Sequence, residues 1–242
     1  MNIEDKLYKL RLLQEQVVSS QDPVHYLANH ARIPSIGLGK HFELYEHQKE
    51  YMSALTSDRF VICKGDRQTG LSISTLMYIF WYAMHHENKN IFILSNTSYG
   101  AEDSLNKIRF AYENLPVSLR NGIEYAENRK SKCRFANGTR IIATSNPHAM
   151  RGATLDLVHV DNFELIKPYT QDELWMSMVP AILSNKESKI IITSSSAGAG
   201  TKLFNRLFRE GAVGKNRFTP ITLRLPDMLI PTNDLTGLEL NI

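Results

Sequence analysis

Residues 59–74, RFVICKGDRQTGLSIS, decide the fold of this chain. An apolar run comes first, and two glycines, Gly65 and Gly70, then precede a helix-like segment. Read from Gly65, the pattern is G-x-x-x-x-G-L-S, whereas a phosphate-binding loop reads G-x-x-x-x-G-K-[S/T]. Leu71 stands where that pattern has lysine. The stretch predicts a buried strand, a tight turn and the first turn of a helix.

Short apolar runs and longer helical patterns alternate along the rest of the chain. Runs rich in isoleucine and valine, without strict alternation, are typical of strands buried on both faces of a sheet. This alternation predicts an α/β fold with a doubly wound, mostly parallel sheet flanked by helices. The expected strands are 59–64, 90–96, 139–146, 155–162, 189–196 and 218–225, and the expected helices are 71–86, 98–115, 170–184 and 199–211. An Asn-Gly turn within 133–141 predicts a hairpin.

The ends of the chain differ from this middle part. We expect a short N-terminal helical segment over 1–45, with an amphipathic helix over 3–18 and Pro/Gly-punctuated connections over 19–27 and 31–42. A further helix is expected over 45–55. The main domain is expected over 46–226, with a linker or docking tail over 227–242.

Composition limits the class of protein. The chain has 242 residues, of which 43% are hydrophobic and 22% are charged, and its net charge is +3. These values are typical of a globular domain, and the basic excess is too small to demonstrate nucleic-acid binding. Cys63 and Cys133 form neither a metal-ligand spacing nor a disulfide framework, which favours an intracellular setting. No secretory signal or membrane span is evident in the sequence.

The loop has the features of an anion site. Its glycines permit tight backbone turns, and its N–H groups and the helix N-terminus favour a phosphate. Ser72 is placed to ligate Mg²⁺, and the nearby cations are Lys64 and Arg67. The other interpretation is a simple strand-to-helix turn. The candidate nucleotide-binding residues are Lys64, Gly65, Asp66, Arg67, Gln68, Thr69, Gly70, Leu71 and Ser72.

A second motif, LDLVHVDNFELI at 155–166, is an apolar strand that ends in Asp161. P-loop ATPases hold Mg²⁺ through such an aspartate and the loop Ser/Thr, so Ser72 and Asp161 form the candidate metal pair. A glutamate normally follows and orients the attacking water, but here Asn162 follows. An amide can position water without accepting its proton, and Glu164 lies two residues further on. A structural strand cap is the alternative for Asp161.

Three segments in this order resemble the ATPase domain of the large terminase subunit of tailed bacteriophages, the motor that packages viral DNA. They are RQTG (67–70), MRGATLDLVHVDN (150–162) and KIIITSSSAGAG (189–200). The resemblance extends from about residue 42 to residue 208. It implies a P-loop NTPase of the RecA/ASCE-like type, which hydrolyses ATP with Mg²⁺ and translocates double-stranded DNA into the procapsid.

The resemblance also implies roles for individual residues. Gln48 matches a glutamine that contacts adenine. Arg67, beside Gln68, matches an arginine with a γ-phosphate or arginine-finger role. Arg151 matches an arginine that acts on the nucleotide of a neighbouring subunit. A coupling motif is matched by Thr193, Ser194 and Ser195. The implied partners are the portal, the small terminase subunit and further copies in a ring, in the cytoplasm of an infected host cell; the nuclease domain of the family has no counterpart here.

Leu71 and Asn162 depart from the family pattern, and Lys64 matches members that carry the loop lysine at the front of the motif. Two alternatives therefore stay open: a catalytically silent terminase-like module for assembly or DNA docking, and a helicase-type ATPase. DNA contacts are not fixed by the sequence. The candidate basic clusters are Arg129, Lys130, Lys132 and Arg134, and Lys202, Arg206 and Arg209.

Overall fold

A computed structural model describes residues 3–35, 39–120, 125–195 and 202–224. Its helices are α1 (Ile3–Gln21), α2 (Pro23–His30), α3 (Glu46–Ser57), α4 (Leu71–His85), α5 (Ser98–Glu113), α6 (Val117–Arg120), α7 (Pro168–Ser184) and α8 (Lys202–Ala212). Two 3₁₀ turns are η1 (Pro147–Met150) and η2 (Phe163–Leu165). The strands are β1 (Arg32–Ile33), β2 (Lys40–His41), β3 (Phe60–Gly65), β4 (Asn90–Leu94), β5 (Tyr125–Arg129), β6 (Lys132–Phe135), β7 (Arg140–Thr144), β8 (Leu157–Val160), β9 (Lys189–Ser195) and β10 (Thr219–Leu223).

One large sheet organises the described residues. Its strand order is β10-β3-β9-β8-β4-β7-β6-β5, and all neighbours from β10 to β7 are parallel. The hairpins β5-β6 and β6-β7 add an antiparallel edge. β1 and β2 form a separate two-stranded ribbon. The predicted mostly parallel α/β fold is therefore confirmed.

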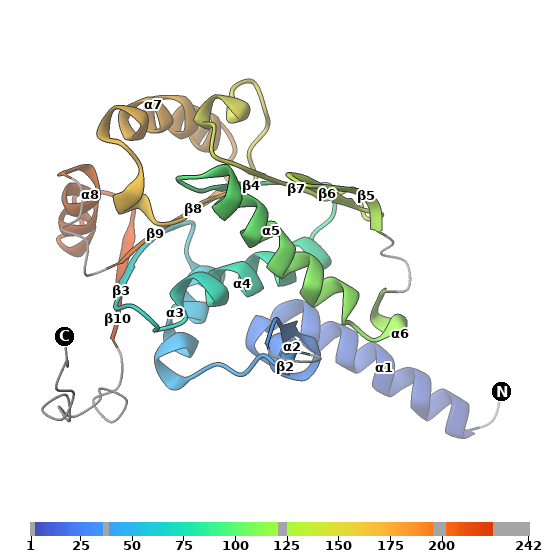
Figure 1. Cartoon of the computed structure of the whole chain (residues 1–242). Coiled ribbons are helices and arrows are strands. Elements are labelled where there is room, and N and C mark those ends of the chain that lie inside the picture. The colour runs from blue at the N-terminus through green and yellow to red at the C-terminus, as the bar shows by residue number, and fades with distance from the viewer. Residues whose placement is uncertain (1–2, 36–38, 121–124, 196–201, 225–242) are drawn as a thin grey trace, which may run out of the picture.

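Helices cover both faces of this sheet (Figure 1). Successive residues of a strand point to opposite faces, so Val61 and Cys63 pack in the core under α2–α5, whereas Phe60 and Ile62 pack under α7 and α8. The other central strands divide in the same way between the two cores. A strand buried on both faces has no polar side to alternate with, which is why the sequence shows continuous apolar runs.

The predicted elements are found with shifts of a few residues at their ends. All six expected strands form, and the hairpin expected over 133–141 is the β6-β7 pair. The helices expected over 3–18, 45–55, 71–86, 98–115 and 170–184 correspond to α1, α3, α4, α5 and α7. α8 corresponds to the last expected helix, from residue 202 onward. The tail expected over 227–242 lies outside the described residues.

The expected connection over residues 19–27 was wrong, because α2 begins within it. Asp22 is the N-cap of α2: its carboxylate accepts hydrogen bonds from the backbone N–H groups of Val24 (2.8 Å) and His25 (3.1 Å). Pro23 occupies the first helical position, where its missing N–H is no loss. The Asp-Pro pair was therefore a helix start and not a turn. The two short strands β1 and β2, which lie within the connection expected over 31–42, were not predicted, and neither were β5, α6, η1 and η2.

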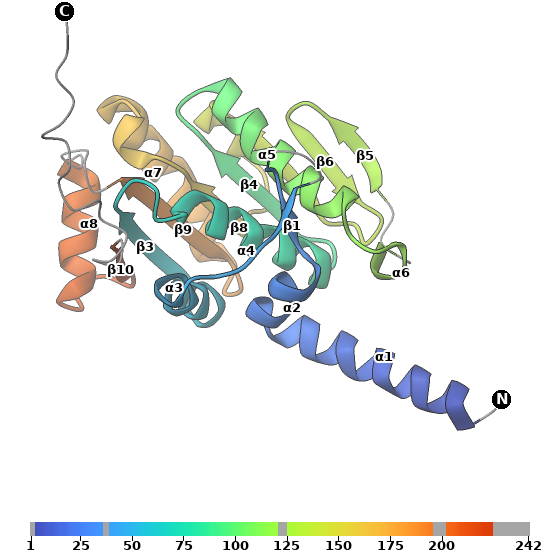
Figure 2. The ribbon, with the colours of Figure 1, turned by 60° about the horizontal axis from the view of Figure 1, so that its bottom comes forward.

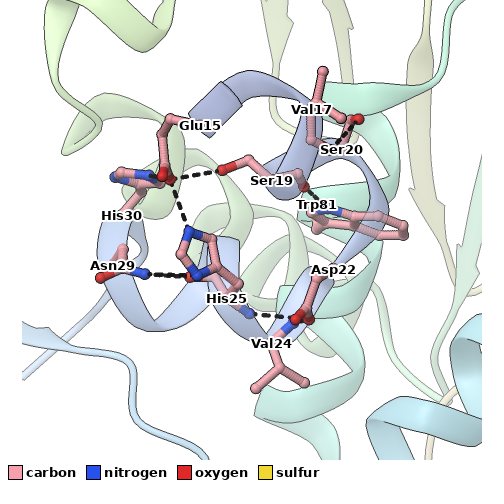
Figure 3. Close-up of polar contacts among 10 residues, drawn as sticks. All are labelled: Glu15, Val17, Ser19, Ser20, Asp22, Val24, His25, Asn29, His30 and Trp81. Atoms are coloured by element: carbon pink, nitrogen blue, oxygen red, sulfur yellow. Dashed lines mark hydrogen bonds and ion pairs between the residues drawn. The ribbon is translucent and has the colours of Figure 1, made fainter. Parts of the chain in front are cut away.

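A polar cluster joins α1 to α2 (Figure 3). The Glu15 carboxylate accepts from Ser19 (3.0 Å) and lies 2.9 Å from His25 Nε2 and 3.1 Å from His30 Nε2. These hydrogen bonds hold the pKa of Glu15 below its usual value. Trp81 of α4 donates to the Ser19 carbonyl (2.8 Å), which ties the corner to the main core. The rest of α1 extends away from the body (Figure 2).

Among the described residues, no helix is both long enough and apolar enough to cross a membrane.

The cap of α2 provides a test of the corrected boundary. Removing an N-cap side chain leaves helix N–H groups without an acceptor and typically costs about 1 kcal/mol. We therefore expect Asp22→Ala to lower the free energy of unfolding by about 1 kcal/mol, measured by urea denaturation. Asp22→Asn is the matched control, since asparagine caps equally well. An equal loss in both variants would contradict the assignment of the cap.

Candidate nucleotide-binding site

Three parallel strands, β3, β9 and β8, are neighbours in the sheet and end at the same edge. Lys64 is opposite Ser194 and Gly65 is opposite Ser195, while Val160 is opposite Ile192. This register brings the loop after β3, the carboxylate after β8 and the hydroxyl groups of β9 together. They line a cleft of about 510 Å³ with residues Gly65–Ile73, Lys107, Asp161, Asn162, Glu164, Leu165 and Thr193–Ser195.

The loop is held in a tight turn by hydrogen bonds within the loop. Thr69 is buried, and its hydroxyl donates to the Asp66 carbonyl (2.8 Å). Gln68 and Gly70 have positive φ angles of 67° and 73°, and glycine adopts such angles without strain. A Cβ on Gly70 would also collide with Nε2 of Gln48. The N–H groups of Asp66 and Thr69 donate within the protein, to the carbonyls of Leu223 (3.0 Å) and Asp66 (3.3 Å), and the loop as a whole lines the cleft.

Asp161 is the centre of the hydrogen-bond network in the cleft. Only 7% of the residue is exposed, and its Oδ1 accepts from Ser72 Oγ (3.2 Å) and Thr193 Oγ1 (3.0 Å). Its Oδ2 accepts from Asn162 Nδ2 (2.9 Å). The two residues predicted as the metal pair, Ser72 and Asp161, are thus in direct contact across 89 residues of sequence.

His159 of β8 lies directly behind this carboxylate. The side chain is fully buried, its Nε2 lies 3.1 Å from Thr193 Oγ1, and its Nδ1 has no hydrogen-bond partner. Burial lowers the pKa of His159 from its usual value, against the opposing pull of Asp161 3.9 Å away. A neutral imidazole is therefore built into the network. His159 was not among the predicted site residues, because a histidine in an apolar run is ordinarily a core residue.

Asn162 and Glu164 occupy different positions in the turn after β8. Asn162 has left-handed backbone angles (φ 49°, ψ 53°), which asparagine tolerates better than other non-glycine residues. The 3₁₀ turn η2 follows, and it places Glu164 at the cleft, where its Oε2 accepts from Ser194 Oγ at 2.7 Å. The carboxylate that the motif lacks at position 162 is therefore present at position 164.

Two of the predicted nucleotide-binding residues have their side chains engaged elsewhere, although Leu71 is among the residues that line the cleft. Leu71 is 8% exposed, and its side chain packs in the core under α2–α5. The ammonium group of Lys64 lies over the ring of Phe208 in α8, 4.5 Å from its centroid, and Lys64 does not line the cleft. The cations that line the cleft, among the described residues, are Arg67 and Lys107. Lys107 belongs to α5, and no motif in the sequence pointed to it.

Gln48 lies beside the loop, but its amide is engaged within the protein. Its Nε2 donates to the Thr69 carbonyl (2.8 Å) and its Oε1 accepts from the Tyr45 N–H (3.0 Å). A second cleft of about 520 Å³ adjoins the first and shares Gln68, Gly70 and Ile73 with it. Gln48 lines this second cleft, and the role predicted for it there stays a prediction.

Arg151 lies apart from the nucleotide cleft. It follows η1 and is exposed, and with Gly152 it lines a shallow hollow against α7. Thr193, Ser194 and Ser195 end β9 and all line the nucleotide cleft. No cluster of three or more His, Cys, Asp or Glu side chains suited to a metal ion occurs in the ranges that the structure describes.

No family model matches the sequence, but solved structures share the fold. The large terminase of bacteriophage HK97 superposes with a TM-score of 0.70 at 14% identity, over 86% of this chain and 44% of that chain. The large terminase ATPase domain of Thermus phage P74-26 has a TM-score of 0.58 at 17% identity, over 76% and 81%. The UvsW helicase of bacteriophage T4 has a TM-score of 0.53 at 13% identity, over 84% and 67%.

The structural neighbours thus include large terminases of bacteriophages, and the predicted resemblance is confirmed at the level of the fold. This chain spans less than half the length of the HK97 terminase and most of the P74-26 ATPase domain.

The backbone angle and the surroundings of Gly70 predict that Gly70→Ala destabilises the fold. Gly70→Ala would combine a left-handed backbone, which costs about 1–2 kcal/mol for a residue with a side chain, with the collision at Gln48. The matched control is Gly214→Ala, since Gly214 has φ 70° and open space around its Cβ position. We expect Gly70→Ala to lower the free energy of unfolding by at least about 1 kcal/mol more than the control. Equal losses of unfolding free energy in the two variants would show that the Gln48 side chain moves away from the new Cβ without cost.

Burial of neutral His159 predicts acid sensitivity. Its folded-state pKa lies below the unfolded value of 6.5, so the unfolded chain binds the proton first as the pH falls. This contribution to stability is present above pH 6.5 and declines below it, by up to about 1.4 kcal/mol per pH unit. His159→Gln keeps a donor near Thr193 but cannot titrate. We expect it to flatten the fall in unfolding free energy between pH 7.5 and 5.5.

The control for this series is His148→Gln, because the side chain of His148 is 45% exposed. An unchanged acid slope in His159→Gln would contradict the buried, neutral state of His159.

Proposed function

We propose that this chain is an ATP-hydrolysing module of the terminase type, which couples hydrolysis to the movement of double-stranded DNA into a procapsid. One observation carries the proposal: Asp161 at the end of β8 contacts both Ser72 of the loop and Thr193 of β9. A strand-to-helix turn of no function would not require a buried carboxylate at its first helical turn. The fold shared with phage terminases supports the proposal.

The residues at Asp161 suit Mg²⁺. The ion prefers oxygen ligands, retains several waters and is commonly held by one or two protein groups together with phosphate oxygens. Ser72 and Asp161 supply a hydroxyl and a carboxylate oxygen 3.2 Å apart. When bound, Mg²⁺ would neutralise charge that develops on the phosphates. The residues that would hold it are Ser72 and Asp161, with Thr193 fixing the carboxylate.

The nucleotide would extend over both clefts. The phosphates would lie on the backbone of Gly65–Ser72, and the adjoining cleft at Tyr45 and Gln48 has room for the nucleoside. For Gln48 to contact adenine, its amide must exchange the Thr69 or the Tyr45 hydrogen bond for one to the base. Arg67 lies in the loop and is exposed, in a position suited to the outer phosphate.

Glu164 is the residue we assign as general base. A base must lie within hydrogen-bond reach of the attacking water, and its carboxylate must accept a proton. Glu164 lines the cleft and is oriented by Ser194. Asn162 holds Asp161 and lacks the chemistry of a base. Ser194 and Thr193 connect the two carboxylates to β9, which fits a coupling role for Thr193, Ser194 and Ser195.

The remaining parts of the proposal concern other molecules. Arg151 is exposed and outside the cleft, as an arginine acting on a neighbouring copy must be, so we propose a homo-oligomeric ring as the active form. Lys202, Arg206 and Arg209 share the exposed face of α8, whose opposite face is buried, and this surface suits the phosphates of DNA. We also propose that the chain acts with the portal and the small terminase subunit, in the cytoplasm of the infected host cell.

A catalytically silent assembly module is the second candidate. The observation that favours it is the packing of Leu71 in the core, which leaves the loop without its usual cation. It predicts no rise in melting temperature with Mg²⁺-ATP, whereas a ligand at 100 times its Kd adds about 2.7 kcal/mol.

The general-base assignment can be tested by Mg²⁺-ATP turnover. Loss of a general base typically slows a reaction by about 10²–10⁴-fold, so we expect Glu164→Gln to bind ATP and to lose turnover by that factor. Asp161→Ala should lose turnover as well. Asn162→Glu restores the family residue but strains the left-handed turn, and we expect no gain in turnover from it. Turnover and its stimulation by double-stranded DNA would be followed by phosphate release.

Full turnover in both Glu164→Gln and Asp161→Ala would overturn the site. Absence of both ATP binding and turnover in the unsubstituted chain would favour the silent module. Turnover together with strand separation would favour a helicase-type ATPase.

A further inference from the structure

A polyphosphate in the cleft needs cations that the loop does not supply. Three carboxylates line the cleft, those of Asp66, Asp161 and Glu164. The position that usually carries lysine is Leu71, whose side chain is packed in the core. Lys64, the neighbouring alternative, directs its ammonium group to the ring of Phe208. Arg67 is therefore the one cationic side chain that the loop supplies to the cleft, among the described residues.

Lys107 is the second cation that lines the cleft, among the described residues. It lies in the middle of α5, which packs beside α4, the helix that the loop opens (Figure 1). A lysine on a regular helix is positioned by a rigid scaffold, while its long side chain keeps the reach to adjust to a ligand. Lys107 thus lines the same cleft as the loop, whereas the ammonium group of Lys64 lies over Phe208.

Lys107 forms a weak ion pair, which a ligand can replace. Its Nζ lies 2.6 Å from Asp103 Oδ2, one turn earlier on α5, and the two side chains are 36% and 46% exposed. Ion pairs of this exposed i,i+4 kind are among the weakest in proteins. Hydrogen bonds from a cation to a phosphate are among the stronger ones. Asp103 does not line the cleft, so a bound phosphate could take the ammonium group from it.

We propose that Lys107 replaces the missing loop lysine, and that its ammonium group binds the β- or γ-phosphate of the nucleotide from α5. The inference rests on the proposed function, because it requires a nucleoside polyphosphate in the cleft. In the absence of nucleotide, Asp103 holds the ammonium group near its binding position.

Calorimetry with Mg²⁺-ATP, Mg²⁺-ADP and AMP on the whole chain tests this inference. Loss of one charge-assisted contact corresponds to about 10- to 100-fold in affinity. We expect Lys107→Met to weaken ATP binding by that factor and to leave AMP binding unchanged, while Lys107→Arg recovers part of the loss. Asp103→Asn should bind ATP at least as tightly as the unsubstituted chain, because it frees Lys107.

The matched control is Lys49→Met. Lys49 forms an exposed pair one turn of helix apart, with Glu46 at 2.7 Å (i,i+3) on α3, and lines neither cleft. If Lys107→Met binds ATP as tightly as the control, the inference is overturned and the proposed function is not. An equal loss for AMP and ATP also overturns it, since that result indicates a structural role. If the unsubstituted chain binds neither ATP nor ADP, the proposed function fails and the inference fails with it.

Discussion

The buried carboxylate of Asp161 is the constraint on which the site depends. A charged group that is 7% exposed must be surrounded by donors, or its burial destabilises the fold. Its donors come from the start of α4, from β9 and from the turn after β8. Ser72, Thr193 and Asn162 therefore cannot move independently. One carboxylate thus joins the loop to β9, and this contact is the basis of the coupling role that we propose for Thr193, Ser194 and Ser195.

The parallel sheet brings the residues that contact Asp161 to the same edge. Neighbouring parallel strands end at the same edge, and the order β3-β9-β8 places the loop and Asp161 on either side of β9. The apolar runs of these strands fill two cores, one on each face, so a shift of register by one residue would exchange the core residues. Packing of the strands thus fixes the position of the polar groups at their ends. The site is a consequence of the same isoleucine and valine residues that hold the sheet together.

Much of the framework could be predicted from sequence, because the signals were local. Continuous apolar runs marked the central strands, and the glycine spacing with Ser72 and Asp161 marked the edge where the site lies. Other features depended on the tertiary structure. The ammonium group of Lys64 lies over Phe208 in α8. The side chain of Leu71 is buried by helices from elsewhere in the chain. Lys107 belongs to no motif, and only the packing of α5 beside α4 brings it to the cleft. The start of α2 was missed although Asp22 and Pro23 signalled it.

The two departures from the nucleotide-binding pattern have local physical explanations. At position 162 the backbone is left-handed, and asparagine suits this conformation better than glutamate. At position 71 the residue lines the cleft but its leucine side chain packs in the core, an apolar environment that suits leucine. In each case a group of the usual chemistry lies at the same cleft on an adjacent element: Glu164 on η2 and Lys107 on α5. The motif alone indicates that two functional groups are lost, whereas we propose that Glu164 and Lys107 supply them from other positions. For a chain of this kind, chemical competence has to be judged from the groups that surround the cleft and not from the loop alone.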